Sequence, residues 1–301
     1  MDVALLVNPV ARGGAAVAAG DRAARRLRAG GVRTTFVAGV GVAGQSAALR
    51  AALDAGADAV VAVGGDGTVH VALQEIGGTD VPLGIIPCGT GNDLARSLGL
   101  RARDAEAAAD VVLTGATRTL DLARATGADG ASRLFATVLA SGFDSRVNDR
   151  ANRMRFPRGA SRYSLAILAE VALLAGAAYR ADLELADGST ERVDGELLLA
   201  AVGNVRTYGG GIPISPAADP TDGLLDVVLV RALSRTRLVR LLPRVYRGTH
   251  LGIREVSSHR VRAVTLASPA GTAYADGDAL GPLPMRIEVL PRALTVFAPV
   301  R

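Results

Sequence analysis

The stretch AVVAVGGDGTVH, residues 59–70, constrains the fold of this chain more than any other segment, because an apolar run leads directly into a glycine-rich turn. The five residues before Gly64 are all alanine or valine. Such a run predicts a strand that is covered on both faces, which is typical of parallel sheets packed between helices. Glycines at the carboxyl end of that strand let backbone N–H groups approach a ligand, and the next helix N-terminus attracts an anion. The stretch therefore predicts a phosphate-binding turn.

Strand and helix patterns alternate through the first 121 residues. We expect strands at 3–7, 33–37, 59–63 and 81–87, and helices at 15–29, at 44–55, after Gly67 and from Asn92 onward. This alternation predicts an open, doubly wound parallel sheet of the α/β class. Beyond residue 121 the strand-like runs follow one another with few helices between them: RLFATVLAS, GELLLAAVGN, LLDVVLVR, RAVTLAS, MRIEVL and ALTVFAPV. We therefore expect a second domain that is mainly antiparallel β.

The absence of lysine excludes two classes of protein. All 34 side chains counted as Lys+Arg are arginines. A Walker A loop needs its phosphate-binding lysine and a pyridoxal enzyme needs its Schiff-base lysine, so neither can be built from this chain. Aromatic residues make up only 3% of the sequence and are not interleaved with basic ones, so we predict no nucleic-acid partner.

Cysteine usage and hydropathy indicate a cytoplasmic protein. The single cysteine, Cys88, excludes an internal disulfide framework and is compatible with a reducing compartment. The opening MDVALLVNPVARGG has no basic region before its apolar run, so we expect a first strand instead of a signal peptide. The apolar helical run at 165–178 contains Glu170 and is shorter than a bilayer span requires.

A second glycine-rich turn, PCGTGNDLAR at 87–96, follows the next expected strand. A lone turn of this kind more often serves tight helix–strand packing, but two turns on neighbouring strands predict one ligand site. Thr68 can donate its hydroxyl to a phosphate oxygen, whereas Asp66 would repel phosphate unless a divalent cation lies between them, so the pair predicts a Mg-nucleotide. The candidate binding residues are Gly64, Gly65, Asp66, Gly67, Thr68, Gly89, Thr90, Gly91, Asn92 and Asp93.

Taken together, these motifs resemble the diacylglycerol kinase catalytic-domain family, which includes soluble bacterial lipid kinases and the sphingosine and ceramide kinases. The resemblance rests on GGDGT at 64–68 and on PCGTGNDLAR about twenty residues later. It extends over nearly the whole chain, through VNPVARGG at 7–14, ASGFDSRVN at 140–148, VGNVRTYGGGIPISPAADPTDGLLDVVLV at 202–230 and ADGD at 275–278. The occurrence of these landmarks in the family's order argues against a chance match.

The resemblance implies a two-domain kinase fold related to those of NAD kinase and phosphofructokinase. The nucleotide-binding domain would comprise residues 1–121 with a returning strand at 290–301, and the lipid-substrate domain residues 122–289. The implied reaction is ATP-dependent transfer of the γ-phosphoryl group to a lipid hydroxyl, with Mg²⁺ as cofactor and diacylglycerol or a related lipid as substrate.

The resemblance also implies roles for individual residues. Asn8, Pro9 and Arg12 would join the nucleotide site, and Arg12 can stand where lysine usually contacts the phosphates. Asp278, or Asp276 beside it, would take the proton of the lipid hydroxyl. Asp66 and Asp93 would act through the nucleotide-bound metal. A further magnesium site would use the Asp222 carboxylate with main-chain oxygens of Asp219 and Leu224.

Three positions depart from the family pattern and keep other functions open. His70 and Val71 stand where Asn and Glu are usual, and Ala38 stands near the place of an expected threonine. A kinase acting on a soluble acceptor, as NAD kinase does, and a nucleotide-binding protein without catalysis therefore remain alternatives. His70 itself is expected to be a hydrogen-bonded packing residue, and Cys88 a small buried thiol.

An arginine-rich segment precedes the apolar run at 165–178. The segment contains six arginines: Arg146, Arg150, Arg153, Arg155, Arg158 and Arg162. Two interpretations fit them equally well. The segment docks on an anionic membrane, at the inner face of the cytoplasmic membrane, or it forms a solvated basic face. The sequence leaves a homodimer open.

Overall fold

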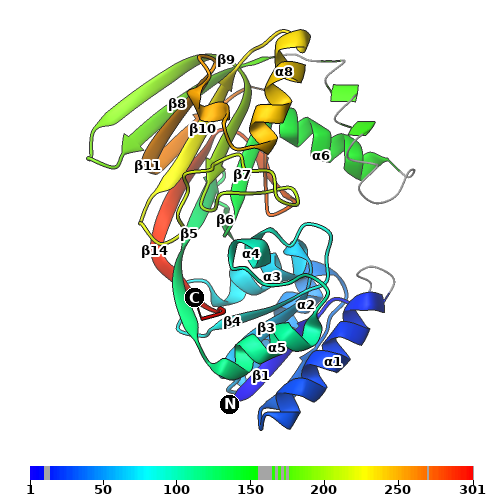
Figure 1. Ribbon diagram of the computed structural model, residues 1–301. Coiled ribbons are helices and arrows are strands. Elements are labelled where there is room, and N and C mark those ends of the chain that lie inside the picture. Colours follow the sequence, from blue (N-terminus) through cyan, green and yellow to red (C-terminus); the bar gives the residue numbers. More distant parts are fainter. Residues whose placement is uncertain are drawn as a thin grey trace. The chain divides into compact units, whose positions relative to one another are not determined.

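The computed structural model describes residues 1–9, 14–154, 165–166, 169–170, 173, 176–269 and 271–300. The chain forms two compact units, one of Met1–Leu122 with Pro291–Arg301 and one of Ala123–Leu290. It passes from one unit to the other twice, within strand β5 (Thr117–Gly127) and within strand β14 (Met285–Phe297) (Figure 1).

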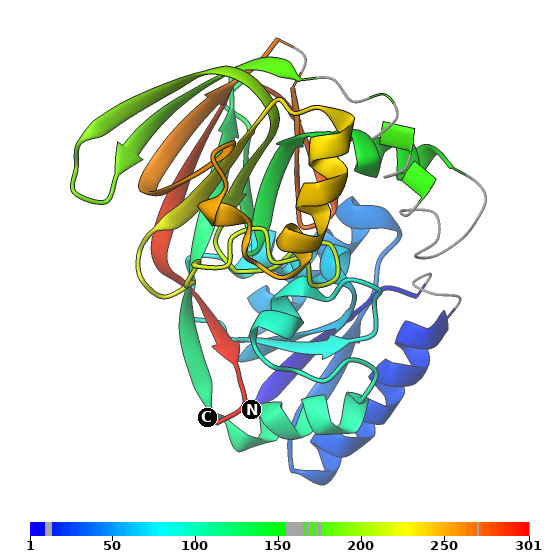
Figure 2. The same cartoon turned by 45° about the horizontal axis from the view of Figure 1, so that its top comes forward.

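The first unit is built on a parallel sheet. Its strands are β1 (Asp2–Val7), β2 (Arg33–Val37), β3 (Ala59–Gly64) and β4 (Leu83–Pro87), in the order β4-β3-β1-β2. Every residue of β3 is buried, as its run of alanine and valine predicts. The end of β14 joins the sheet beside β4, where Val296 pairs in parallel with Leu83 (Figure 2).

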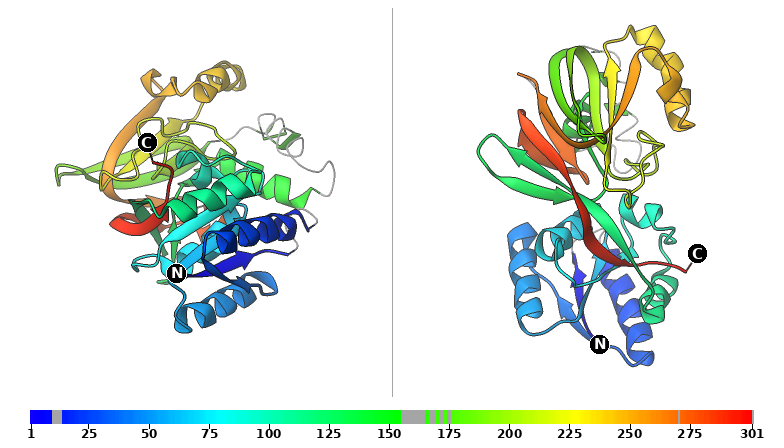
Figure 3. Two further views of the ribbon diagram at one scale, coloured as in Figure 1. Left: turned by 60° about the horizontal axis from the view of Figure 1, so that its bottom comes forward. Right: turned by 90° about the vertical axis from the view of Figure 1, so that its left-hand side faces the viewer.

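Helices cover both faces of this sheet. Helices α1 (Ala15–Ala29) and α5 (Ala105–Thr114) pack on one face, and α2 (Gly41–Asp54) and α3 (Asp66–Ile76) on the other (Figure 3, right). Alternate strand residues such as Leu5 and Val61 share a core with α1 and α5. A short helix, α4 (Asp93–Ser97), follows β4. The expected doubly wound α/β sheet is thereby confirmed.

The second unit is mainly antiparallel β, which confirms the other half of the expected fold class. Adjacent strands run β13-β12-β7-β9-β10-β11-β14, while β8 pairs with β9 and β11, and β6 pairs with β5. The bounds are β6 (Ser132–Phe135), β7 (Val138–Gly142), β8 (Ala177–Leu185), β9 (Thr190–Gly203), β10 (Leu225–Arg231), β11 (Val256–Ala267), β12 (Thr272–Ala275) and β13 (Asp278–Pro282). Strand β9 pairs with β8 up to Leu197, with β10 from Leu197 onward and with β7 from Leu199 onward, so one long strand serves three pairings.

Two apolar clusters stabilise the second unit. One cluster lies among the strands and includes Phe135, Val227 and Ile287. The other lies on the opposite side of β7, β9 and β10 and is covered by helices α6 (Phe143–Arg153) and α8 (Arg235–Tyr246) with the short 3₁₀ helix η2 (His250–Gly252) (Figure 1). Burial of these apolar side chains is the main favourable term in folding.

Three of the segments interpreted from the sequence have a different structure from the expected one. The run RLFATVLAS forms two strands, β6 and β7, with a break at Ala136 and Thr137. The runs MRIEVL and ALTVFAPV form one strand, β14, with a positive φ of 55° at Arg292. In the apolar run at 165–178, residues 165–166 and 169–170 are helical and 177–178 already belong to β8, while most of the others lie outside the described residues. Within the described part of the chain no helix has the length and hydropathy needed to cross a bilayer.

Candidate functional site

The first glycine turn connects β3 to α3, and Thr68 fixes its shape. Thr68 is buried, and a Cβ built on Gly64 would lie 2.1 Å from the Thr68 Oγ1 atom. The threonine side chain therefore occupies the space beside Gly64, which only glycine leaves free. Gly67, by contrast, is exposed and has open space around it. The expected contact between the Thr68 hydroxyl and a phosphate stays a prediction.

The second turn follows β4 and is closed by Asn92. Asn92 has a left-handed backbone with φ 53°, a conformation that asparagine tolerates better than most residues. Its Oδ1 atom accepts the Gly89 N–H at 2.9 Å, and its Nδ2 atom donates to the Gly89 carbonyl at 3.1 Å. Thr90 is exposed at the tip of this turn.

The two turns interlock, while the ligand site that the sequence predicts for them stays a prediction. A Cβ on Gly89 would lie 2.4 Å from the Gly65 Cα atom, so the two backbones touch. The Asp66 carboxylate accepts the Asn92 N–H at 2.8 Å and the Asp93 N–H at 2.7 Å. Asp66 thus caps the amino end of α4 from a different turn, with its negative charge at the positive end of that helix.

Strand register places a third segment at the same edge of the sheet. Val7 pairs with Val63, and Gly64 pairs with Pro87, so β1, β3 and β4 end side by side. Asn8 and Pro9 follow β1 and therefore lie at this edge. Arg12 falls in the 10–13 segment, outside the described residues. His70 is buried on α3 and Cys88 is a buried thiol, both as expected.

The oxygen-rich edge of the first unit has the donor chemistry of a magnesium nucleotide site. Within the described residues, no three His, Cys, Asp or Glu side chains gather into a cluster that could hold a metal ion unaided. Magnesium sites for nucleotides typically take only one or two carboxylates and fill their other positions with phosphate oxygens and water. The carboxylates of Asp66 and Asp93, two residues joined by the hydrogen bond from the Asp93 N–H to Asp66, fit that pattern.

In the second unit, the two candidate catalytic carboxylates have different environments. Asp276 lies in the turn between β12 and β13 with φ 52°, and its carboxylate accepts the Ala136 N–H at 3.3 Å and the Thr137 N–H at 3.2 Å. The Thr137 hydroxyl donates a further hydrogen bond to Asp276. Asp278 is exposed at the start of β13. Asp276 therefore fixes the backbone of the two residues that separate β6 from β7, while Asp278 is exposed.

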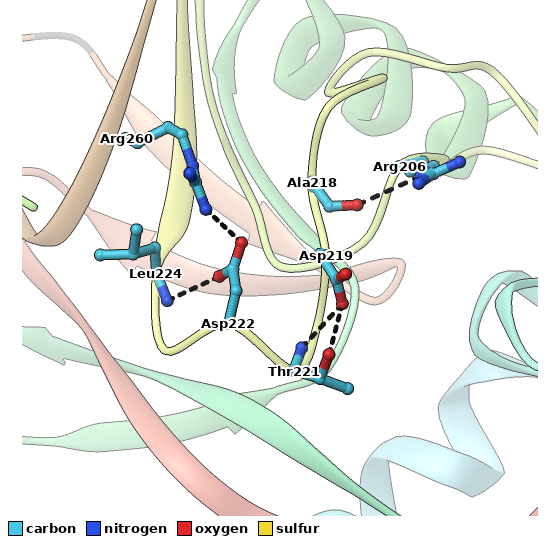
Figure 4. A network of polar contacts seen from close by, with 7 residues as sticks. All are labelled: Arg206, Ala218, Asp219, Thr221, Asp222, Leu224 and Arg260. Carbon is cyan, nitrogen blue, oxygen red and sulfur yellow. Dashed lines mark hydrogen bonds and ion pairs between the residues drawn. The ribbon is translucent and has the colours of Figure 1, made fainter.

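The loop at 219–224 is held by carboxylates (Figure 4). Asp219 Oδ1 accepts the Thr221 N–H at 3.1 Å and the Thr221 hydroxyl at 2.7 Å. Asp222 Oδ1 accepts the Leu224 N–H at 3.0 Å, and Asp222 Oδ2 pairs with the guanidinium of Arg260. A cation at this loop would have to share the Asp222 carboxylate with Arg260 or displace it, so the second magnesium site stays a prediction.

A buried acid lies beside this loop. Asp226 on β10 is almost fully buried and pairs in register with Arg260 on β11. Burial raises the pKa of Asp226 from 3.8 to about 6, the positive charge of Arg260 opposes that rise, and the negative charge of Asp222 adds to it. Sequence reasoning missed Arg260, because only the strand register brings it to these two acids.

The three described arginines of α6 each pair with an acid. Arg146 and Arg150 pair with the buried Glu170 at 3.2 and 2.7 Å, and Arg153 pairs with Asp149 at 2.8 Å. Arg155, Arg158 and Arg162 lie outside the described residues. Two of these arginines share the single Glu170 carboxylate, and docking through this segment stays a prediction.

Comparisons with known proteins agree with this arrangement. The diacylglycerol kinase catalytic domain matches residues 2–125, and the YegS C-terminal NAD kinase beta sandwich-like domain matches residues 137–298. The chain is 46% identical over 297 residues to a diacylglycerol kinase of Mycobacterium tuberculosis, covering 99% of this chain and 95% of that protein. It is 26% identical over 246 residues to a diacylglycerol kinase of Bacillus subtilis, covering 80% of this chain and 78% of that protein.

The fold is also that of a solved structure. A crystal structure of a diacylglycerol kinase from Bacillus anthracis matches with a TM-score of 0.77 at 21% identity, covering 99% of this chain and 97% of the other. At that identity the likeness establishes the fold alone.

Proposed function

The chain belongs to the diacylglycerol kinase family of lipid kinases, and on this premise we propose that it transfers the γ-phosphoryl group of ATP to a hydroxyl of diacylglycerol or a closely related lipid. The observation that carries the proposal is the pair of interlocked glycine turns at 64–68 and 87–93, joined through Asp66. The likeness to the diacylglycerol kinase of Mycobacterium tuberculosis extends over 99% of this chain, which supports a lipid acceptor over a soluble one.

The first unit is proposed to bind ATP through its turns. Gly67 is exposed with open space around it, so a phosphate can approach the first turn there without meeting a Cβ. Asn8 and Pro9 at the end of β1 line the same edge of the sheet. Phosphoryl transfer depends mainly on alignment and charge stabilisation, so rigid turns suit the task.

We assign the nucleotide-bound Mg²⁺ to the carboxylates of Asp66 and Asp93. When bound, the ion would neutralise charge on the phosphates. Asp66 would then have two tasks, since its carboxylate also fixes the Asn92 and Asp93 backbone. The loop at 219–224 is the proposed second magnesium site, subject to competition from Arg260.

Asp278 is the proposed group that orients the lipid hydroxyl and takes its proton. Its exposed position supports this choice, and so does the commitment of Asp276 to the Thr137 backbone and hydroxyl. General-base catalysis by a positioned carboxylate typically contributes about 10²- to 10⁴-fold in rate. A cytoplasmic location and a homodimer remain predictions.

The decisive experiment is the transfer of labelled phosphate from Mg-ATP to diacylglycerol, phosphatidylglycerol, ceramide, sphingosine and NAD, with the lipids in mixed micelles. We expect label in diacylglycerol. Label only in NAD would replace the lipid acceptor with a soluble one, and ATP binding without any labelled product would favour a protein that binds nucleotide without catalysis.

Two matched variants separate catalysis from folding in this assay. Asp278→Asn should lower kcat about a hundredfold or more, with ATP affinity and melting temperature unchanged. Asp276→Asn should instead lower the melting temperature, because the amide presents one acceptor oxygen where the carboxylate has two. If Asp276→Asn abolished kcat without loss of stability while Asp278→Asn remained active, the two roles would be reversed.

A further inference from the structure

Helix α8 has a buried side and an exposed side of unusual composition. Its sequence is RTRLVRLLPRVY, and Arg247 follows at the C-cap. Leu238 and Leu241 are buried in the cluster that covers β7, β9 and β10. The helix lies at the surface of the second unit, where its opposite side faces solvent (Figures 1 and 3).

Two parallel stripes run along the exposed side. Residues spaced by three and four lie on one face of a helix, so Val239, Pro243 and Tyr246 form an apolar stripe. Val239 is 54% exposed and Tyr246 is 58% exposed. The same spacing, shifted by one residue, gives a basic stripe of three exposed arginines beside it: Arg240, Arg244 and Arg247.

Among the residues that the structure describes, no acid forms an ion pair with the basic stripe. Residues 232–254 contain no aspartate or glutamate. Arg237 pairs with Glu255 at 3.1 Å, but in the described part of the chain Arg240, Arg244 and Arg247 have no ion-pair partner. This differs from α6, whose arginines pair with Glu170 and Asp149.

We propose that the exposed side of α8 docks on a bilayer that contains anionic phospholipid. The proposal rests on the lipid-kinase function, because a kinase of that class must reach a substrate held in a membrane. Headgroup phosphates would attract the arginines, and the apolar stripe would enter the boundary between headgroups and acyl chains. Arginine stems can lie along apolar surface while their charges stay at the phosphates, and tyrosine favours the same interface.

The combination of stripes favours a bilayer over other anionic partners. A nucleic acid would satisfy the arginines but gives no apolar layer for Val239 and Tyr246. An anionic membrane supplies both chemistries, in the parallel arrangement that the helix presents.

The test is sedimentation of the full chain with vesicles of phosphatidylcholine alone and of phosphatidylcholine with one-third phosphatidylglycerol. The wild type should bind the anionic vesicles only. The triple variant Arg240→Gln/Arg244→Gln/Arg247→Gln should bind them about a hundredfold more weakly, as expected for three basic residues near a charged surface. Val239→Ser/Tyr246→Ser should also weaken binding, because it removes the apolar stripe and keeps the charge.

A matched control removes the same charge elsewhere. Arg22, Arg25 and Arg101 are exposed in the first unit, so Arg22→Gln/Arg25→Gln/Arg101→Gln changes the net charge equally. This control should bind vesicles as the wild type does. Equal weakening in both triple variants would overturn the proposal, as would failure of the wild type to bind anionic vesicles.

Two further readouts distinguish membrane docking from a loss of catalysis and from self-association. Phosphorylation of a short-chain, water-soluble diacylglycerol should be the same in the α8 triple variant and the wild type. If no lipid is phosphorylated by either protein, the proposed function fails, while the vesicle measurement still decides the docking of α8. Unchanged vesicle binding with a smaller oligomer in light scattering would assign this face to a second copy and overturn membrane docking.

Discussion

Asp66 shows at the residue scale how one carboxylate can join distant parts of the sequence. Its two oxygens accept N–H groups that lie 26 and 27 residues further along the chain. The GGDGT motif predicted a metal role for this residue, because an acid near phosphates requires a cation. The hydrogen bonds to Asn92 and Asp93 were not predictable from the motif, since they depend on how the second turn folds against the first. Asp66 therefore has a structural role whether or not it also contacts the metal.

His250 gives a prediction for the pH dependence of stability. It is fully buried, and its Nε2 atom is 2.9 Å from the Ile214 carbonyl oxygen, which fits a neutral ring that donates from Nε2. Burial lowers the pKa of His250 from 6.5, although hydrogen bonds to the main chain oppose the shift. The unfolded chain therefore binds the proton more readily, and the stabilisation present above pH 6.5 is lost as the pH falls toward the folded-state pKa.

Urea unfolding between pH 5 and pH 8 measures this effect. Below pH 6.5 the free energy of unfolding should fall by at most about 1.4 kcal/mol per pH unit through this one group. His250→Gln keeps a side-chain N–H donor but cannot titrate, so its stability should depend less steeply on pH. Parallel curves for the two proteins would show that His250 does not titrate in this range.

At the scale of elements, the sequence predicted best where a local pattern decides the structure. Strands β2 and β3 and helix α1 were expected almost to the residue, because their apolar spacing and flanking glycines are local signals. The break between β6 and β7 was missed, since Ala136 and Thr137 give their N–H groups to Asp276, about 140 residues away. Helix α8 was missed as well, because its arginines and internal Pro243 obscure the helical pattern.

The contact between the two glycine turns gives an element-scale prediction. Gly89→Ala would place a Cβ 2.4 Å from the Gly65 Cα atom and 2.8 Å from the Asn92 Oδ1 atom. Relief of that overlap must separate the turns, at a cost of about 1–3 kcal/mol. Calorimetric titration should therefore show weaker ATP binding, with a dissociation constant that rises about tenfold for each 1.4 kcal/mol lost from the free energy of binding.

A control glycine tests whether this loss is specific. Gly252 has open space around it and an ordinary backbone conformation, so Gly252→Ala should leave ATP binding and stability unchanged. If Gly89→Ala bound ATP as tightly as the wild type, close approach of the two turns would not be required for the nucleotide site.

At the scale of the whole molecule, the first unit is not one continuous stretch of the chain. The first unit contains both the start of the chain and its last strand segment, Pro291–Arg301. Nothing in the local pattern of ALTVFAPV distinguishes it from the runs that precede it, and only the family resemblance implied a returning strand. A buried carboxylate lies where β5 and β14 pass from one unit to the other: Asp121 on β5 accepts the Arg292 N–H at 2.7 Å.

This arrangement predicts that the last strand stabilises a unit whose two glycine turns lie about two hundred residues earlier. Phe297 is 4% exposed and packs in the core that α1 and α5 share with β1 and β3. Phe297→Ala should lower the free energy of unfolding by about 3–5 kcal/mol, measured by urea denaturation. Phe36→Ala is the matched control, because Phe36 in the same unit is 43% exposed and should cost far less. Saturating Mg-ATP should restore part of the stability lost in Phe297→Ala, since a ligand that binds only the folded unit shifts its unfolding equilibrium. An equal, small loss in both variants would mean that the returning strand adds little to the first unit.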